Sequence, residues 1–234
     1  MPDARSAHLR IAADLRAQIM AGTLNPGEKL PSTAQLITRY SAANATIQAA
    51  VGVLKEEGFL RSEHGVGVFV RDRHVFAIDP SAYYDPATRG VTYKMLDVRE
   101  VEPPADVAAA LGEDRAALRH RRTDRGSDAV ELSWSYYPLS LVAGTPLTGR
   151  AKIPGGAPRV LTELGYPELS FSDRVTARMP TTEEVEGLDV PPNVPVLRQF
   201  RTVYSHDRRP VEVSIIVKPA HLYELHYERD IPSE

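Results

Sequence analysis

The sequence of 234 residues contains no cysteine. A chain without thiols can form neither a disulfide framework nor a thiolate nucleophile or thiolate metal site. It also lacks any apolar run near the roughly 18 residues that a membrane span requires, and no signal-peptide pattern precedes the first candidate helix. The 42% of hydrophobic residues suits one large or two modest globular domains. We therefore expect a cytoplasmic protein that has no membrane partner.

An excess of charge of one sign is missing as well. The formal net charge is −3, and residues 1–70 carry seven Lys and Arg against six Asp and Glu. Nucleic-acid-binding domains usually present a basic surface, so composition alone does not indicate one here. If residues 1–70 bind DNA, their weak attraction to phosphates predicts a modest salt dependence and a reliance on dimerisation.

Residues 30–70 nevertheless contain an ordered series of local signals. Ser32 and Gln35 have the spacing of a capping box, which predicts a helix that begins at Thr33. This helix is expected to end near Tyr40, where a turn follows. The spacing therefore predicts the first half of a helix-turn-helix.

A second helix and a hairpin are expected after this turn. Apolar residues recur at helical spacing, namely Ile47, Ala50, Val51 and Leu54. Gly58 is a natural helix stop, and two β-rich runs, 59–62 and 68–70, are joined through Gly65 and Gly67. Helix, turn, helix and β-hairpin together make a winged helix-turn-helix, whose second helix enters the major groove of DNA.

This segment and the helix before it resemble the N-terminal domain of GntR-family bacterial transcription regulators. The similarity runs without a gap and is much longer than a short motif. It is carried by Ile11, Leu15, Ile19, Gly22, Pro26, Gly27, Leu30, Pro31, Ser32, Leu36, Thr46, Leu54, Glu57, Gly58, Phe59, Gly65, Gly67, Phe69 and Val70. The resemblance implies a homodimer that binds a near-palindromic operator in double-stranded DNA, with half-site spacing set by the dimer symmetry.

The second helix departs from the family pattern. The family usually begins it Ser-Arg-x-Thr-Val-Arg, whereas residues 43–48 read Ala-Asn-Ala-Thr-Ile-Gln. Asn44 and Gln48 thus replace two arginines. Amide side chains pair bidentately with adenine and arginine prefers guanine, so we expect an adenine where the family's half-site has guanine. Ala43 also lacks an N-cap hydroxyl, and Ser41 is expected to cap the helix one turn earlier.

The wing differs from the family too. His64 and Gly65 form its tip, where the resemblance implies contact with DNA, but Val66 stands where a lysine often contacts phosphate. The alternatives are that His64 is a solvated loop residue, or that the whole head is degenerate and no longer binds DNA. The candidate DNA-binding residues are Ser32, Thr33, Arg39, Asn44, Thr46, Gln48, His64 and Gly65.

The chain is expected to divide into a DNA-binding domain at 1–72, a linker at 73–91 and a second domain at 92–234. Pro80 and Pro86 limit regular structure in the linker, which is expected to contribute at most an edge strand. The extended segments expected in the second domain are 92–101, 117–125, 130–138, 175–178, 196–204 and 211–217, and the expected helices are 104–111, 159–164 and 182–188. Charged turns between adjacent strands predict an α+β fold with a mainly antiparallel sheet.

The second half resembles the UTRA effector domain of the HutC-type GntR subfamily, whose fold is like that of chorismate lyase. Three segments carry this resemblance: LRHRRTD at 118–124, VELSWSYYP at 130–138 and RQFRTVYSHDRRPVEVSIIVKP at 198–219. The resemblance implies dimerisation through this domain and an effector pocket. The residues that it places in the pocket are Arg119, Arg121, Glu131 and Glu212.

Strand periodicity supports part of this pocket. Arg119 and Arg121 are two residues apart and face the same side of a strand, where two guanidiniums can bind an anion. Ser133 shares a face with Glu131 in the same way, so the pocket suits a small polar effector such as a sugar phosphate or an amino-acid derivative. The alternative is that 119–122 forms a solvated edge. Further candidate effector-binding residues are Tyr136, Ser170, Ser172 and Arg178.

These patterns predict a transcriptional regulator, in this family most often a repressor, that a small molecule releases from its operator or tunes on it. Two alternatives stay open. One is a constitutive DNA binder whose second domain only dimerises, and the other is an enzyme fused to a DNA-binding head. No acid and base pair with a supporting third group can be identified, so we expect no catalytic residue, and we expect no metal ligand and no cofactor.

Overall fold

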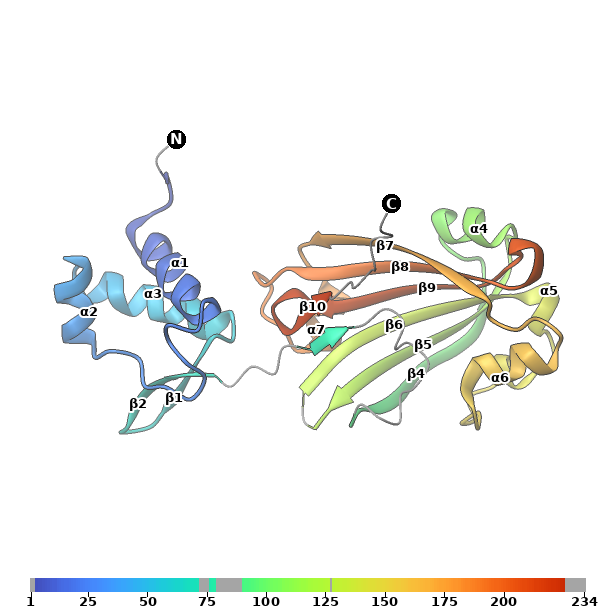
Figure 1. Ribbon diagram of the computed structural model, residues 1–234, viewed down its shortest axis with the longest axis horizontal. Coiled ribbons are helices and arrows are strands. Elements are labelled where there is room, and N and C mark those ends of the chain that lie inside the picture. Colours follow the sequence, from blue (N-terminus) through green and yellow to red (C-terminus); the bar gives the residue numbers. More distant parts are fainter. Residues whose placement is uncertain (1–2, 72–75, 79–89, 127, 226–234) are drawn as a thin grey trace, which may run out of the picture. The chain divides into compact units, whose positions relative to one another are not determined.

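The computed structural model describes residues 3–71, 76–78, 90–126 and 128–225. The chain divides into two compact units, 1–75 and 76–234 (Figure 1). Most of the expected linker lies outside the described residues. Within it, strand β3 (Phe76–Ile78) pairs in parallel with β10 (Tyr223–Leu225). No helix in the described part of the chain is long and apolar enough to cross a membrane.

The first unit contains the predicted helices and hairpin. Its elements are α1 (Ala7–Met20), α2 (Thr33–Tyr40), α3 (Asn44–Glu56), β1 (Leu60–Glu63) and β2 (Gly67–Val70). The two strands are antiparallel, with Leu60 opposite Val70. An isolated bridge between Lys29 and Phe69 adds the segment before α2 to this hairpin. The winged helix-turn-helix expected from the sequence is therefore confirmed.

One apolar core holds the first unit together. Leu15 of α1, Leu36 of α2 and Ile47 of α3 are at most 1% exposed, and full burial of each such side chain contributes about 1.5–3 kcal/mol. Arg16 also donates from Nε and Nη2 to the carboxylate of Glu57 at 2.8 and 2.6 Å, which ties α1 to the C-terminal end of α3. Helix α3 is therefore anchored along its inner face and at its C-terminus, and its N-terminal turns remain exposed.

The second unit is built on a six-stranded sheet in the order β4-β5-β6-β9-β8-β7. Its strands are β4 (Thr92–Val101), β5 (Ala116–Arg125), β6 (Asp128–Pro138), β7 (Ser170–Arg178), β8 (Val196–Tyr204) and β9 (Pro210–Pro219). Every neighbouring pair is antiparallel, which confirms the predicted fold class. Strand β7 begins at Ser170, earlier than the expected start at Val175.

Helices α4 (Ala105–Leu111) and α7 (Thr182–Leu188) pack on one face of this sheet, here called the α4/α7 face. Leu111 of α4 joins a buried cluster with Tyr136 and Phe200. Leu188 of α7 is buried in a second cluster with Leu132. Tyr136, Phe200 and Leu132 lie on the same face because side chains alternate along each strand and the register aligns them across the sheet.

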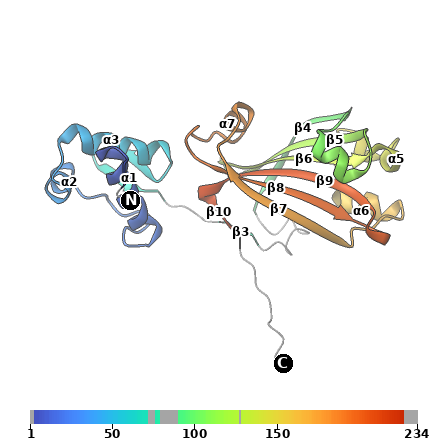
Figure 2. The same ribbon diagram turned by 90° about the horizontal axis from the view of Figure 1, so that it is seen from above.

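Helix α5 (Leu139–Val142), turn η3 (Pro146–Thr148) and helix α6 (Gly156–Glu163) lie against the opposite face, at one end of the sheet. They form a buried apolar cluster with Tyr137 and Val203. Figure 2 shows α6 and α7 on opposite sides of the sheet. Polar side chains occupy much of the rest of this face, which we call the polar face.

Two glycines allow a test of how closely α7 packs on the sheet. A Cβ added to Gly187 would lie 2.6 Å from Cδ1 of the buried Leu132, whereas one added to Gly52 in α3 would meet nothing within 4 Å. Alanine in a helix gains about 0.5–1 kcal/mol over glycine, but overpacking a core costs about 1–3 kcal/mol. We therefore expect Gly52→Ala to stabilise the first unit and Gly187→Ala to destabilise the second, as measured by thermal unfolding. A stabilising Gly187→Ala would contradict this packing.

Candidate functional site

The predicted capping box of α2 is present. The backbone N–H of Ser32 donates to the side-chain Oε1 of Gln35 at 2.8 Å. The backbone N–H of Gln35 donates to Oγ of Ser32 at 3.3 Å. The Ser32 hydroxyl also donates to the Gln35 amide oxygen at 2.9 Å. The candidate DNA contact Ser32 therefore already has a structural role at the start of α2.

The N-terminal turns of α3 present amides to solvent. Asn44 and Gln48 are both exposed and lie one turn apart, on one side of the helix. Gln48 Nε2 donates to Oγ1 of Thr33 at 3.2 Å, which joins the exposed sides of α2 and α3. Thr46 is half-buried beside them. The structure thus brings four of the predicted DNA-binding residues to the first turns of these two helices.

The expected cap of α3 is not formed by Ser41. Ser41 instead ends α2 in the left-handed conformation, with φ 49°. Ala43 occupies the N-cap of α3 and makes no side-chain hydrogen bond. The amides at the start of α3 therefore lack a side-chain cap, and a DNA phosphate is one group that can satisfy such amides.

Arg39 lies toward α1. Its Nη2 is 3.9 Å from the carboxylate of Asp14, and its guanidinium stacks 5.3 Å from the ring centre of Tyr40. Burial, reinforced by the hydroxyl's hydrogen bond to Asp14, raises the pKa of Tyr40 to about 12. Arg39 is itself exposed, so its contact with α1 leaves it accessible to solvent.

The side chain of Lys29, from the segment before α2, lies beside the wing, which the sequence did not predict. His64 is exposed and Gly65 has φ 72°, as a tight turn requires. A Cβ on Gly67 would lie 2.6 Å from Cε of Lys29, so the lysine stem runs along the wing. Lys29 therefore supplies a positive charge close to Val66, which stands where the family often has lysine. Sequence reasoning missed it because the two segments are far apart in the chain.

The polar face of the second unit gathers ionic and hydroxyl side chains from five strands. Most of them are at most 6% exposed, so each must find a partner within the protein or in a ligand. The register places the following residues on this face: Arg119, Arg121, Glu131, Ser133, Ser135, Asp173, Gln199, Arg201, Glu212, Ser214 and Lys218.

Arg119 is bound by the protein itself. Its Nη1 donates to the carbonyl oxygens of Leu147 and Gly149 at 3.0 and 2.6 Å, and to that of Pro146 at 3.4 Å. Burial lowers the pKa of its guanidinium. Arg119 thus anchors the η3 turn over the sheet, a role that the anion-clamp hypothesis did not foresee.

A chain of hydrogen bonds crosses three strands on this face. Arg121 Nη2 donates to Oγ of Ser135 at 3.0 Å, and the hydroxyls of Ser135 and Ser214 lie 2.7 Å apart. The Ser214 hydroxyl in turn donates to the carboxylate of Glu212. The predicted effector-binding residues Arg121 and Glu212 are therefore joined in one network through Ser135 and Ser214.

A second network lies beside the first. Arg201 donates from Nε and Nη2 to Asp173 at 2.7 and 2.6 Å, and Gln199 donates to the same carboxylate at 3.0 Å. Lys218 donates to Gln199 at 3.0 Å and forms an ion pair with Glu131 at 3.2 Å. The candidate Glu131 is therefore neutralised by a lysine that the sequence did not single out.

Glu168, just before β7, is the least satisfied acid near this face. Both carboxylate oxygens are shielded from solvent and accept no hydrogen bond from any residue that the structure describes. Burial, together with the charge of Glu212, raises the pKa of Glu168 to about 8, although Arg201 opposes this shift. Burial and the carboxylate of Glu212 likewise raise the pKa of Tyr137. No sequence motif pointed to Glu168.

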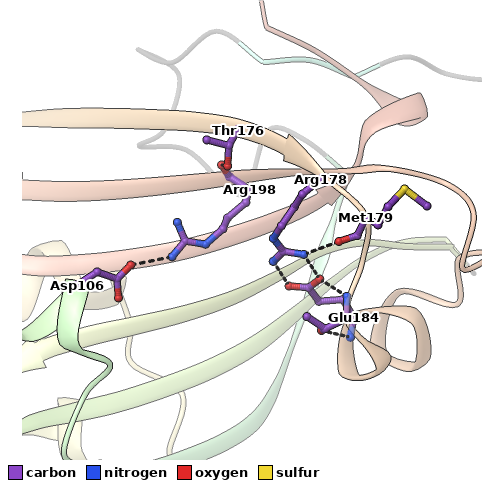
Figure 3. A network of polar contacts seen from close by, with 7 residues as sticks. Asp106, Thr176, Arg178, Met179, Glu184 and Arg198 are labelled. Atoms are coloured by element: carbon purple, nitrogen blue, oxygen red, sulfur yellow. Dashed lines mark hydrogen bonds and ion pairs between the residues drawn. The ribbon is translucent and has the colours of Figure 1, made fainter.

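Four of the predicted effector-binding residues lie on the α4/α7 face instead. Strand alternation places Tyr136, Ser170 and Ser172 there. Arg178, also on this face, donates to both carboxylate oxygens of Glu184 at 2.7 and 2.5 Å and so ties β7 to α7 (Figure 3). The structure therefore separates these four from Arg119, Arg121, Glu131, Ser133 and Glu212, because a sheet divides its side chains between two sides.

Each of the two units matches the model of a known protein family. The model described as bacterial regulatory proteins, gntR family, matches residues 7–70, and the UTRA domain model matches residues 87–224. The chain belongs to the GntR family. It is a DNA-binding transcription regulator of the group that carries a UTRA domain, a domain that binds small-molecule effectors.

Individual relatives are similar over nearly the whole chain. An uncharacterized HTH-type transcriptional regulator of Streptomyces coelicolor is 28% identical, over 92% of this chain and 89% of the relative. The mannosyl-D-glycerate transport/metabolism system repressor MngR of Escherichia coli is 26% identical, over 88% of each. A crystal structure of a GntR-family regulator matches with a TM-score of 0.62 and 26% identity, over 97% of this chain and 99% of that one. PhnF from Mycobacterium smegmatis shares the fold, with a TM-score of 0.58 at 15% identity.

The buried carboxyl of Glu168 predicts a pH-dependent stability of this GntR-family regulator. Its folded pKa of about 8 lies above the ordinary value of 4.5, so folding favours the protonated acid, and the wild type loses stability as pH rises between these values. We expect Glu168→Gln to match the wild type near pH 5 and to melt at a higher temperature at pH 8. The exposed Glu163, replaced by Gln, is the control. An equal difference at both pH values would contradict the assignment.

Proposed function

We propose that this GntR-family regulator is a homodimeric, effector-responsive repressor that binds a near-palindromic operator, and that a small polar molecule bound on the polar face changes its affinity for that operator. It acts in the compartment that holds the DNA, which is the cytoplasm in bacteria. The observation that carries this proposal is the polar face itself. It concentrates buried ionic groups in the unit that matches the UTRA domain.

Energetics support a ligand-binding role for this face. Replacing buried ion pairs with apolar side chains often leaves stability unchanged or improves it, so stability alone does not explain two polar networks inside one sheet. The serine hydroxyls, Arg121 and Glu212 offer both donors and acceptors, which suits a polar ligand. Coupling between such a ligand and DNA is typically worth about 1–3 kcal/mol.

The exposed sides of α2 and α3 support the DNA-binding part of the proposal. Asn44 and Gln48 present amides suited to adenine, and Lys29, His64 and the Gly65 amide are candidates for contacts to the DNA backbone at the wing. Arg39 and Thr33 are candidates at α2. Because of these two amides, we expect operator half-sites in which adenine replaces the guanine of the family's half-site.

An enzyme is the less supported alternative. The relatives are transcription regulators, and similarity of fold to a lyase is not evidence for turnover. A constitutive binder, whose second unit only dimerises, would be favoured if no small molecule changed operator affinity. The relative MngR is a repressor, and this supports the proposed sign of regulation.

Fluorescence anisotropy on the DNA upstream of the regulator's own gene tests this proposal. We expect the wild type to bind this DNA more tightly than scrambled DNA. Gln48→Ala should weaken the binding by about 1–3 kcal/mol, because one bidentate base contact is lost. Gln48→Arg should shift selected sites toward guanine. Equal loss of binding to scrambled DNA would show that Gln48 makes no base contact, and equal affinity of the wild type for both DNAs would contradict specific regulation.

A further inference from the structure

The tip of the wing has no lysine or arginine of its own. Residues 63–67, which form this tip, are Glu-His-Gly-Val-Gly. Val66 is 54% exposed there, and its apolar side chain offers nothing to a phosphate. Glu63, the acid of the tip, forms an ion pair with Arg61 of β1. A fixed positive charge at this tip must therefore come from another segment of the chain.

The segment before α2 lies along the wing as a short third strand. The backbone N–H of Leu30 donates to the carbonyl of Val68 at 2.8 Å, and that of Val70 donates to the carbonyl of Glu28 at 2.8 Å. Lys29, between these two hydrogen bonds, is paired with Phe69 in an antiparallel bridge. The backbone therefore fixes the point from which the Lys29 side chain starts.

The Lys29 side chain extends from this point toward the tip. Lys29 and Phe69 share a face of the wing because they are directly opposite each other, and Gly67, two residues from Phe69, lies on the same face. A Cβ added to Gly67 would lie 2.6 Å from Cε and 3.3 Å from Nζ of Lys29. The stem thus occupies the space that the glycine leaves open, and the ammonium lies beside the tip.

The ammonium of Lys29 is not neutralised by a neighbouring acid. It forms no ion pair or hydrogen bond with any residue that the structure describes. The adjacent acid, Glu28, accepts instead from the backbone and side-chain N–H groups of Asn25 at 2.9 and 3.2 Å. By contrast, four of the seven Lys and Arg residues in 1–70 have acidic partners, namely Arg5, Arg16, Arg39 and Arg61.

We propose that Lys29 binds a DNA phosphate at the wing and so supplies the charge that the tip lacks. This inference rests on the DNA-binding part of the proposed function and assigns one residue a defined role in it. A lysine acts on a phosphate as a point charge and reads no base. Because the stem already lies along Gly67, the side chain loses less conformational freedom when the phosphate binds.

The near neutrality of residues 1–70 makes this contact measurable. Each phosphate that a cation neutralises contributes about 0.9 to the slope of log affinity against log salt concentration. Since most of the arginines in 1–70 are paired with acids, the total slope is expected to be small. The loss of one cation from each head therefore removes a large share of it.

Fluorescence anisotropy of the full-length chain across a salt series tests the inference, on the upstream DNA and on scrambled DNA. Lys29→Gln keeps a long side chain and removes the charge. We expect the slope to fall by about 0.9 for each bound head, and the affinity for both DNAs to fall by the same factor, because phosphates carry no sequence information. Gln48→Ala, in contrast, should weaken binding to the upstream DNA selectively.

Two further variants complete the test. Lys55→Gln removes the same charge from an exposed position in the last turn of α3, far along the helix from Asn44, and should leave the slope unchanged. The double variant Lys29→Gln/Val66→Lys returns an ammonium to the tip from the wing itself and should restore the slope.

Three outcomes overturn the inference: an unchanged slope in Lys29→Gln, an equal fall in Lys55→Gln, or no recovery in the double variant. Failure of the proposed function looks different. If the wild type binds both DNAs equally and Lys29→Gln still lowers the slope, the phosphate contact stands and specific regulation fails. A wild type that binds neither DNA overturns both.

Discussion

The second unit depends on one constraint, which is that charged side chains buried on a sheet must pair with an opposite charge or have their hydrogen bonds satisfied. Arg201 with Asp173 and Lys218 with Glu131 meet this requirement directly. Arg119 meets it by donating to three backbone carbonyls instead. Because these partners come from β5 through β9 and from η3, the side-chain contacts link five strands of the sheet to one another and to the η3 turn.

The same constraint bears on Glu168, whose carboxylate oxygens have no hydrogen-bond partner among the described residues. A buried charge that is fully paired is tolerated in the fold, whereas one left without partners raises the free energy of the folded state. Glu168 belongs to the second kind. Its oxygens are shielded and its pKa is raised to about 8, so part of the cost of burying this carboxyl is met by binding a proton.

Local signals in the sequence predicted local structure well. The capping box of Ser32 and the helical spacing around Ile47 gave α2 and α3 close to their observed bounds. Strand alternation correctly placed Arg119 and Arg121 on one side of β5. What it could not predict was which strands lie side by side, since β6 pairs with β9 across more than seventy intervening residues of chain.

Long-range pairing therefore accounts for the differences between sequence and structure. Tyr136 and Arg178 are reasonable polar candidates in isolation, yet the register places both on the α4/α7 face. Arg119 was expected to form an anion clamp because its carbonyl partners at 146–149 are not visible as a motif.

The central claim is that a small effector binds on the polar face. Hydrogen–deuterium exchange of the full-length chain, with and without a small-molecule extract that lowers operator affinity, tests this claim most directly. If the effector binds on the polar face, protection is expected in β5, β6 and β9; protection confined to α4 and α7 would contradict this.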